Sequence, residues 1–131
     1  MEDRINQVFK CDICGNVVEM LYDGNTPVSC CGQPMISLVA ESKEESKEKH
    51  VPVITKTPEG LLVKIGSTPH PMTQEHYIVW VELVVGDEVY RRQLKPGMKP
   101  ELLFRVHGED VKVRCYCNLD GMWKNWYMPK Q

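Results

Sequence analysis

The residues in this sequence best suited to chemistry are its six cysteines, which fall into two groups far apart along the chain. The first group is near the N-terminus and the second near the C-terminus; together they are Cys11, Cys14, Cys30, Cys31, Cys115 and Cys117. In a reducing compartment cysteines are seldom joined in structural disulfides, and thiolates are good ligands for zinc and iron. The clustering therefore favours metal ligation or redox chemistry.

The N-terminal group has the spacing of a four-thiolate metal site. In the segment CDIC one tight turn brings the sulfurs of Cys11 and Cys14 to a single ion, and Gly15 allows the tight backbone conformation that follows. The adjacent pair Cys30 and Cys31 is less usual, because neighbours on an extended strand point in opposite directions. Both sulfurs reach one ion only if the backbone kinks there, and the glycine directly after the pair favours such a kink.

Residues 1–38 contain few large apolar side chains, and a unit that small seldom folds without a metal or a cross-link. We predict that the four cysteines hold a redox iron. Two disulfides or a purely structural zinc are the alternatives, because four-cysteine iron and four-cysteine zinc both favour tetrahedral sulfur.

A second set of candidate ligands is spread over the C-terminal part of the chain. Three histidines lie before or between the first predicted strands, and the segment CYCNLDGMW adds a thiol and a carboxylate; the candidates are His50, His70, His76, Cys117 and Asp120. One histidine on a strand is usually structural, but a loop opened by Pro71 can aim two of these imidazoles at one point. His107, in the turn HGED, is expected at the surface.

The elements that must position these side chains are predicted as short strands rich in Val, Ile, Leu and aromatic residues. Turn signals such as TPEG and KPGMKP separate them, and no helical pattern intervenes. Gly86 and Asp87 predict a tight hairpin. The seven predicted strands cover residues 51–56, 61–66, 77–85, 88–94, 101–107, 110–116 and 122–128.

The pattern of the sixth strand orients two of the cysteines. Alternation places Cys115 and Cys117 on one face with two valines, so Cys115 is expected in the core. The predicted fold is all-β, with a small metal-binding domain (1–38), a charged linker (39–49) and an antiparallel sandwich of immunoglobulin-like architecture (50–131).

The bulk composition excludes several function classes. The chain has 131 residues, and its 16 basic and 18 acidic residues leave a net charge of -2. This balance argues against a nucleic-acid partner or a membrane-surface protein. The charged N-terminal segment MEDRINQVFK has no apolar core, and no stretch approaches the roughly 18 apolar residues of a membrane span. We expect a soluble, cytoplasmic protein.

The motifs that carry these candidate ligands resemble those of a known family. CDIC with CC, then EKHVPV, HPMTQEHYI, LKPGMKPE and CNLDGMW, in this order and along nearly the whole chain, resemble desulfoferrodoxin, a superoxide reductase with two iron centres. The resemblance implies a desulforedoxin-like N-terminal domain with a four-cysteine iron, an immunoglobulin-like domain with a mononuclear non-haem iron, and a homodimer.

The resemblance also implies ligand roles at the second iron. His50, His70 and His76 match the first three equatorial histidines, and Cys117 matches the axial thiolate. Here the chain departs from the family, because Asp120 stands where the family has a fourth histidine. We hypothesise that Asp120 coordinates, since carboxylate is an accepted iron ligand. The rival interpretation turns Asp120 away to water.

The activity that the resemblance implies is one-electron reduction of superoxide to hydrogen peroxide at the coordination position opposite the thiolate. Lys49 and Glu48 match the family's catalytic lysine and a glutamate that can cap the ferric iron; alternatively, both are simply the end of the charged linker. A rubredoxin-like protein would supply electrons. The competing function is an electron-transfer or metal-binding protein whose second centre has altered reactivity because of Asp120.

Overall fold

A computed structural model describes residues 4–42 and 50–128, which form strands, turns and loops with no helix. The all-β prediction is confirmed. The chain divides into two compact units, Met1–Val39 and Ala40–Gln131. Within the described ranges, no helix of the length and apolarity needed to cross a membrane occurs.

The first unit is built from two small antiparallel sheets. Strands β1 (Val8–Lys10), β2 (Val17–Glu19) and β5 (Ile36–Leu38) form one sheet in the order β2-β1-β5, and β3 (Ser29–Cys30) pairs with β4 (Gln33–Pro34) in the other. Among the described residues of this unit, the buried hydrophobic side chains are Val8, Phe9 and Cys11. Such a core is very small.

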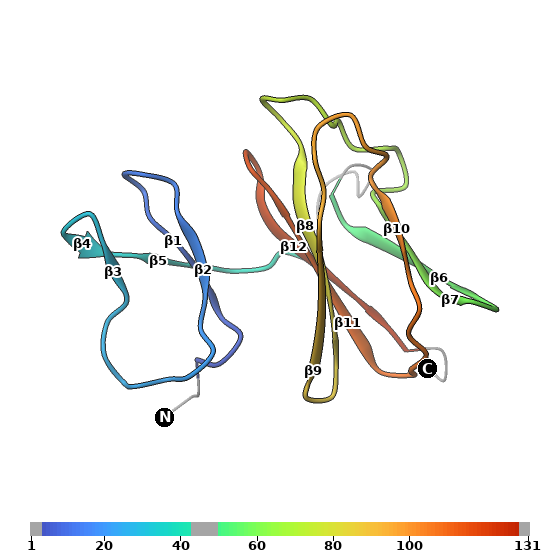
Figure 1. The fold of residues 1–131 in the computed structure, drawn as a ribbon, viewed down its shortest axis with the longest axis horizontal. Helices are drawn as coiled ribbons and strands as arrows, with labels where there is room; N and C mark the ends of the chain where they lie inside the picture. The colour runs from blue at the N-terminus through green and yellow to red at the C-terminus, as the bar shows by residue number, and fades with distance from the viewer. Residues whose placement is uncertain (1–3, 43–49, 129–131) are drawn as a thin grey trace. The chain divides into compact units, whose positions relative to one another are not determined.

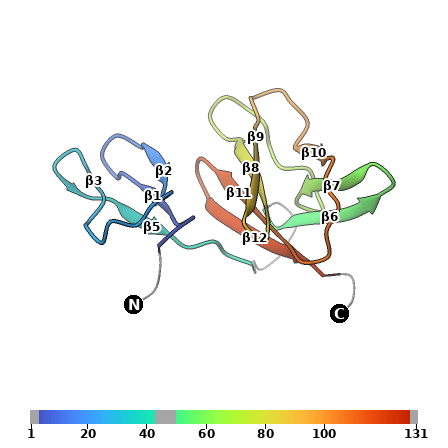
Figure 2. The same ribbon diagram turned by 60° about the horizontal axis from the view of Figure 1, so that its bottom comes forward.

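The second unit is a sandwich of two antiparallel sheets (Figure 1; Figure 2 gives a turned view). One sheet has the order β10-β7-β6 and comprises β6 (Pro52–Thr57), β7 (Gly60–Ile65) and β10 (Glu101–Phe104). The other has the order β12-β11-β8-β9 and comprises β8 (Ile78–Val85), β9 (Glu88–Gln93), β11 (Val111–Cys117) and β12 (Gly121–Tyr127).

All seven predicted strands are present, and the hairpin at Gly86 and Asp87 joins β8 to β9 with Val85 opposite Glu88. Strand β10 ends at Phe104, earlier than predicted, and there it lies close to Gly60 at the start of β7. A Cβ atom at Gly60 would lie 2.1 Å from the carbonyl oxygen of Phe104, so this close approach requires glycine.

The core lies between the two sheets and comes from their inward-facing side chains. It contains Leu61, Val63, Ile65, Ile78, Val81, Leu83, Leu94, Leu102, Phe104, Val111, Val113, Cys115 and Cys117. Cys115 is fully buried, as the alternation in β11 predicts. The sulfur of Cys117 belongs to the same cluster, so the core reaches directly to the candidate ligands.

The face of β11 and β8 that points away from the core carries a buried ion pair, which the sequence pattern does not predict. Glu82 is 0% exposed, and its carboxylate accepts a hydrogen bond from Nε of Arg114 at 2.9 Å. Arg91, on the neighbouring strand β9, donates to the other carboxylate oxygen at 3.1 Å. The two arginines satisfy a carboxylate that would otherwise be costly to bury.

The predicted linker, residues 39–49, begins with a segment hydrogen-bonded to the sandwich. Glu41 pairs in parallel with Trp123: its N–H donates to the Met122 carbonyl (2.9 Å), and its carbonyl accepts from the Lys124 N–H (2.8 Å). The rest of the linker from residue 43 to residue 49, including the predicted Glu48 and Lys49, lies outside the described residues.

Candidate metal centres

Loops and strand ends at one edge of the sandwich carry the five candidate ligands of the second set. His50 directly precedes Val51 and β6, and His70 and His76 lie in the connection between β7 and β8. Cys117 is the last residue of β11, where the pairing with β8 shifts by a β-bulge after Tyr116. Asp120 lies in the tight turn between β11 and β12.

The structure brings these five side chains together. Their potential donor atoms all lie within 4.8 Å of one another. The His50 and His70 ring centroids are 4.9 Å apart, and those of His70 and His76 are 4.8 Å apart. Cys117 is 0% exposed whereas the Asp120 side chain is 40% exposed, so the cluster has a buried sulfur and a solvent-accessible carboxylate.

The carboxylate of Asp120 faces into the cluster. Its Oδ2 lies 2.8 Å from Nε2 of His50, 2.9 Å from Nε2 of His76 and 3.5 Å from Sγ of Cys117. Burial raises the pKa of Asp120, but the hydrogen bonds with His50 and His76 outweigh it and the net pKa is lowered. An anionic oxygen therefore lies between two imidazole nitrogens.

These distances suit adjacent ligands of one ion. Two donors at right angles, each about 2.1 Å from a metal, are about 3.0 Å apart. The separations from Asp120 Oδ2 to the His50 and His76 nitrogens are 2.8 and 2.9 Å. The separations are therefore compatible with Asp120 Oδ2 and the two imidazole nitrogens as donors to one ion.

His70 provides an independent indication that the cluster binds a metal. Its Nδ1 lies 2.7 Å from the Pro71 carbonyl, which only accepts, so Nδ1 carries the proton. Burial lowers the pKa of His70 and favours the neutral ring, which leaves Nε2 with a lone pair. Nε2 is buried and has no hydrogen-bond partner among the described residues. This is the arrangement of a metal-binding histidine, in which one ring nitrogen binds the metal and a hydrogen bond from the other nitrogen fixes the orientation of the ring.

Two residues with no role in the sequence analysis hold the ligands in place. Asn118 braces the loop of His76 on both sides: its Oδ1 accepts from the Tyr77 N–H and its Nδ2 donates to the Glu75 carbonyl, each at 2.9 Å. The segment CNLDGMW contains Asn118, but its contacts depend on a loop 41 residues away along the chain.

Trp123 supports the other side of the cluster. Its ring stacks on His50 with centroids 4.7 Å apart and an interplanar angle of 17°. Its Nε1 donates to the Asp120 carbonyl at 3.1 Å. One side chain therefore fixes both a histidine plane and the turn that presents the carboxylate.

The N-terminal group forms the second cluster. The sulfurs of Cys11, Cys14, Cys30 and Cys31 lie within 4.8 Å of one another, with Cys14 and Cys30 3.6 Å apart and Cys30 and Cys31 3.9 Å apart. Sulfurs at two corners of a tetrahedron with 2.3 Å metal bonds are about 3.8 Å apart, whereas a disulfide is about 2.05 Å. The geometry fits a four-thiolate ion and not the disulfide alternative.

Backbone geometry explains how adjacent cysteines reach one point. Cys31 has φ of 54° and Gly32 has φ of 78°, so the kink expected after Cys30 is present. Gly15, with φ of 83°, closes the turn after the first pair. Three residues with left-handed backbone conformation, at two turns, thus allow the four sulfurs to point toward one another.

The sulfurs also interact electrostatically. The N–H of Cys14 lies 3.5 Å from Sγ of Cys11 and, as the largest influence, lowers the pKa of Cys11 to about 6. Cys14 and Cys11, through their sulfurs, raise the pKa of Cys31 to about 12. Cys11 therefore loses its proton readily, whereas the neighbouring sulfurs make it harder for Cys31 to lose its own. A bound cation would favour the deprotonated form of all four cysteines.

The remaining predictions for single residues agree with the structure. Cys115 is buried in the core, and its sulfur lies 3.5 Å from the His50 carbonyl rather than among the ligands. His107 is exposed and lies outside the cluster, as expected.

Comparison with known proteins assigns both parts of the chain to one family. Residues 3–38 match the family model "Desulfoferrodoxin, N-terminal domain", and residues 42–126 match the model "Desulfoferrodoxin". The chain is 48% identical to the desulfoferrodoxin of Syntrophotalea carbinolica over 119 residues, covering 91% of this chain and 94% of that one. It is 32% identical to the superoxide reductase of Thermococcus kodakarensis, covering 70% and 96%.

Among solved structures, the superoxide reductase of Treponema pallidum is similar over 94% of this chain and 99% of its own, with a TM-score of 0.76 and 25% identity. The one-iron superoxide reductase of Giardia intestinalis aligns with 61% of this chain and 97% of its own, with a TM-score of 0.54 and 31% identity. Two family models together span most of the sequence, and the chain belongs to the desulfoferrodoxin family.

Proposed function

We propose that this protein is a superoxide reductase whose second centre uses Asp120 in place of a fourth histidine. The observation that carries the proposal is the convergence of three imidazoles, one thiol and one carboxylate, with all donor atoms within 4.8 Å. Relatives named superoxide reductase support the reaction class.

A mononuclear iron bound there would supply one electron to superoxide and a coordination position for it. The reaction adds that electron and two protons to superoxide and gives hydrogen peroxide. His50, His70 and His76 offer neutral nitrogens, and the Cys117 sulfur approaches from the buried core side. The open side of the cluster, where Asp120 is 40% exposed, admits a small anion and protons from water.

The ligand set differs from that of the family in its charge. Cys117 and Asp120 together bring two negative charges to the centre, whereas a histidine at position 120 would leave only the thiolate. Burial raises the pKa of Cys117, so the sulfur becomes an effective donor when a cation holds it as thiolate. The carboxylate should favour the ferric state.

Glu48 and Lys49 are proposed to assist catalysis on the strength of the family motif EKH. An ammonium about 6 Å from a bound anion contributes roughly 3 kcal/mol at an effective dielectric of about 20, before screening by salt. That suffices to attract superoxide and to help protonate the product.

The four-cysteine cluster is proposed to hold an iron that stores or relays electrons. A rubredoxin-like electron donor and a homodimer complete the proposal on the strength of family membership, and a cytoplasmic location on the strength of the sequence composition. The chemistry at the second centre does not depend on the dimer or on the location, whereas repeated turnover requires an electron donor.

The decisive experiment measures how much peroxide and dioxygen form for each superoxide consumed. Iron-loaded, pre-reduced protein is mixed with superoxide in a stopped-flow instrument, and peroxide and dioxygen are both measured. A reductase forms one peroxide per superoxide and no dioxygen, whereas dismutation gives both products. If superoxide decays no faster than in buffer, the competing function is correct, and the second centre serves only in metal binding or electron transfer.

A further inference from the structure

The segment LKPGMKPE, residues 94–101, has no role in the proposed chemistry but is fixed beside the loop that carries His70. The Gly97 N–H donates to the Met72 carbonyl at 2.8 Å, and the Ile65 N–H donates to the Pro100 carbonyl at 2.9 Å. Two prolines restrict the backbone of this segment further. The segment therefore forms a stiff wall next to a ligand loop.

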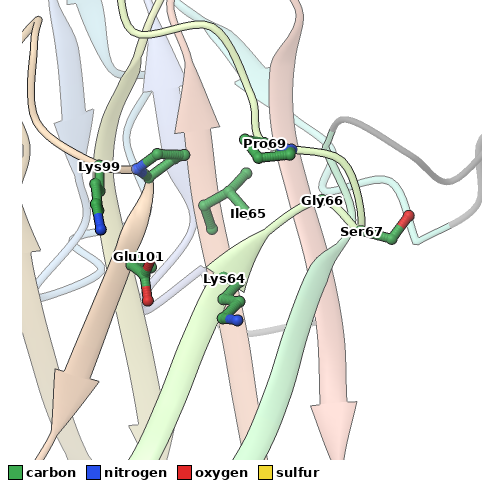
Figure 3. Close-up of a pocket in the computed structure, with 8 residues that line it drawn as sticks. Lys64, Ile65, Gly66, Ser67, Pro69, Lys99 and Glu101 are labelled. Atoms are coloured by element: carbon green, nitrogen blue, oxygen red, sulfur yellow. The ribbon is translucent and has the colours of Figure 1, made fainter.

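An open hollow of about 360 Å³ lies between this wall, the end of β7 and the start of the His70 loop (Figure 3). Lys64, Lys99 and Glu101 line it, with Ile65 between Lys64 and Pro69 in Figure 3. Pro69 is covalently joined to His70. Only one peptide unit thus separates the lining of the hollow from a candidate ligand.

Positive charge continues beyond the hollow. A second depression shares Lys99 and Glu101 with the first and adds Arg92 and Arg105. The four cations Lys64, Arg92, Lys99 and Arg105, called here the basic face, are all exposed, and Glu101 is the one acidic residue lining either hollow. The basic face thus carries local positive charge on a chain whose net charge is -2.

We propose that the basic face docks an acidic electron-donor protein that reduces the second centre through the Pro69 to His70 peptide. The inference rests on the proposed function, because each superoxide reduced consumes one electron that an outside donor must replace. The donor loses that electron and the ferric centre gains it, with no bond made or broken.

The dimensions favour a protein over a small anion. Lys64 lies on β7 and Arg92 on β9, whereas Lys99 and Arg105 lie just before and just after β10. The four cations line two adjoining depressions rather than converging on one point. Spread, exposed charges of this kind raise the association rate of an oppositely charged protein and lose their effect as salt increases. The Arg92 side chain also donates to the Leu103 carbonyl at 3.2 Å, which holds two sheet edges together beneath the face.

The test compares three charge reversals of equal size in the full-length, iron-loaded protein. Lys64→Glu and Lys99→Glu change the basic face, and Lys56→Glu is the matched control, since Lys56 is exposed near the opposite end of the β6 and β7 hairpin. The probe is reduced rubredoxin of net negative charge. Stopped-flow absorption of the thiolate-bound ferric centre gives the second-order rate of its reduction at low and high salt.

We expect Lys64→Glu and Lys99→Glu to slow reduction by rubredoxin at least about fivefold at low salt, and Lys56→Glu to stay within about twofold of wild type. The difference should shrink at high salt. Circular dichroism verifies that the variants are folded. Equal rates in all four proteins would overturn the proposal.

A separate measurement distinguishes this inference from the proposed function. Each protein is pre-reduced chemically and mixed with superoxide, which bypasses the donor. Unchanged superoxide rates in the two variants are expected; equal slowing in both assays would mean that the face attracts superoxide itself, and would overturn docking. A wild type that reacts with rubredoxin but not with superoxide would refute the proposed function alone.

Discussion

At the scale of single residues, Asp120 decides how this centre differs from a four-histidine one. Its Oδ2 lies 2.8 Å from Nε2 of His50 and 2.9 Å from Nε2 of His76. A ligating anion stabilises the ferric state, so its removal should raise the reduction potential.

We therefore predict that Asp120→His raises the potential of the second centre by at least about 59 mV, a tenfold change in the one-electron equilibrium. Redox titration of the visible absorption band measures it. Asp120→Asn is the control of matched shape, and it should also raise the potential. If Asp120→Asn leaves the potential unchanged, the carboxylate is not a ligand and faces water in the loaded protein.

Asn118 is a positioning residue, because its side chain hydrogen-bonds the main chain on both sides of His76. Asn118→Ala removes both braces, and we expect about 10- to 100-fold weaker metal binding at the second cluster. Asn118→Asp keeps the acceptor for Tyr77 and should lose less. Chelator competition measures the affinity.

Leu119→Ala is the control for this experiment, since Leu119 is 64% exposed in the same turn. Its affinity should match wild type. Equal affinity in Asn118→Ala and wild type would show that the loop of His76 is held without Asn118.

At the scale of strands, hydrophobic pattern predicts the sandwich well because one face of each strand is buried against a single core. Strands β6 to β12 appear where the runs of apolar residues predict them, and Cys115 is inside. The sequence also predicts which side chains form the second cluster. In the fold, strand ends and tight turns at one edge of the sandwich bring them together.

The sequence does not predict features that depend on distant partners. The contacts of Asn118 and Trp123 with ligand loops need the folded arrangement, and so does the parallel pairing of Glu41 with Trp123. Alternation alone would leave Arg114 on a solvated face. It is 4% exposed, because the fully buried Glu82 lies opposite it on β8.

The pair of Glu82 and Arg114 supports a prediction about stability. Arg114→Met leaves Arg91 as the ionic partner of the Glu82 carboxylate among the described residues. The substitution should cost about 3 kcal/mol, since breaking a buried pair typically costs 3–5 kcal/mol. Chemical denaturation measures the loss. The double variant Glu82→Leu with Arg114→Met should recover most of it; an equal or larger loss would mean that packing, and not charge, dominates there.

At the scale of the whole molecule, the two units differ in what holds them together. The sandwich has a continuous core between two sheets, with several side chains, such as Val63, Leu83 and Val113, at 0% exposure. In the first unit the described buried hydrophobic residues are Val8, Phe9 and Cys11, and one of these is a candidate ligand. The Arg4 and Asp23 ion pair, at 2.7 Å, adds a partly exposed contact.

Units of about 40 residues usually need a metal or cross-links, because too little apolar surface is buried to offset chain entropy. We therefore predict that Cys14→Ser, in the full-length protein, releases the metal of the first unit and exposes its amides to rapid hydrogen exchange in β1 and β2. The amides of β8 and β11 should stay protected, since the core of the sandwich does not include those sulfurs.

The reciprocal control is His76→Ala, which removes a candidate ligand of the second cluster and should leave protection in β1 and β2 intact. Hydrogen exchange followed by mass spectrometry resolves the two units in one experiment. Should β1 and β2 remain protected in metal-free Cys14→Ser, the first unit would fold by its own packing, and the four sulfurs would be retained for electron transfer and not for stability. Loss of protection limited to the first unit would instead mean that its metal is structural, so the proposed electron-transfer role could not be tested by removing the metal without unfolding the unit.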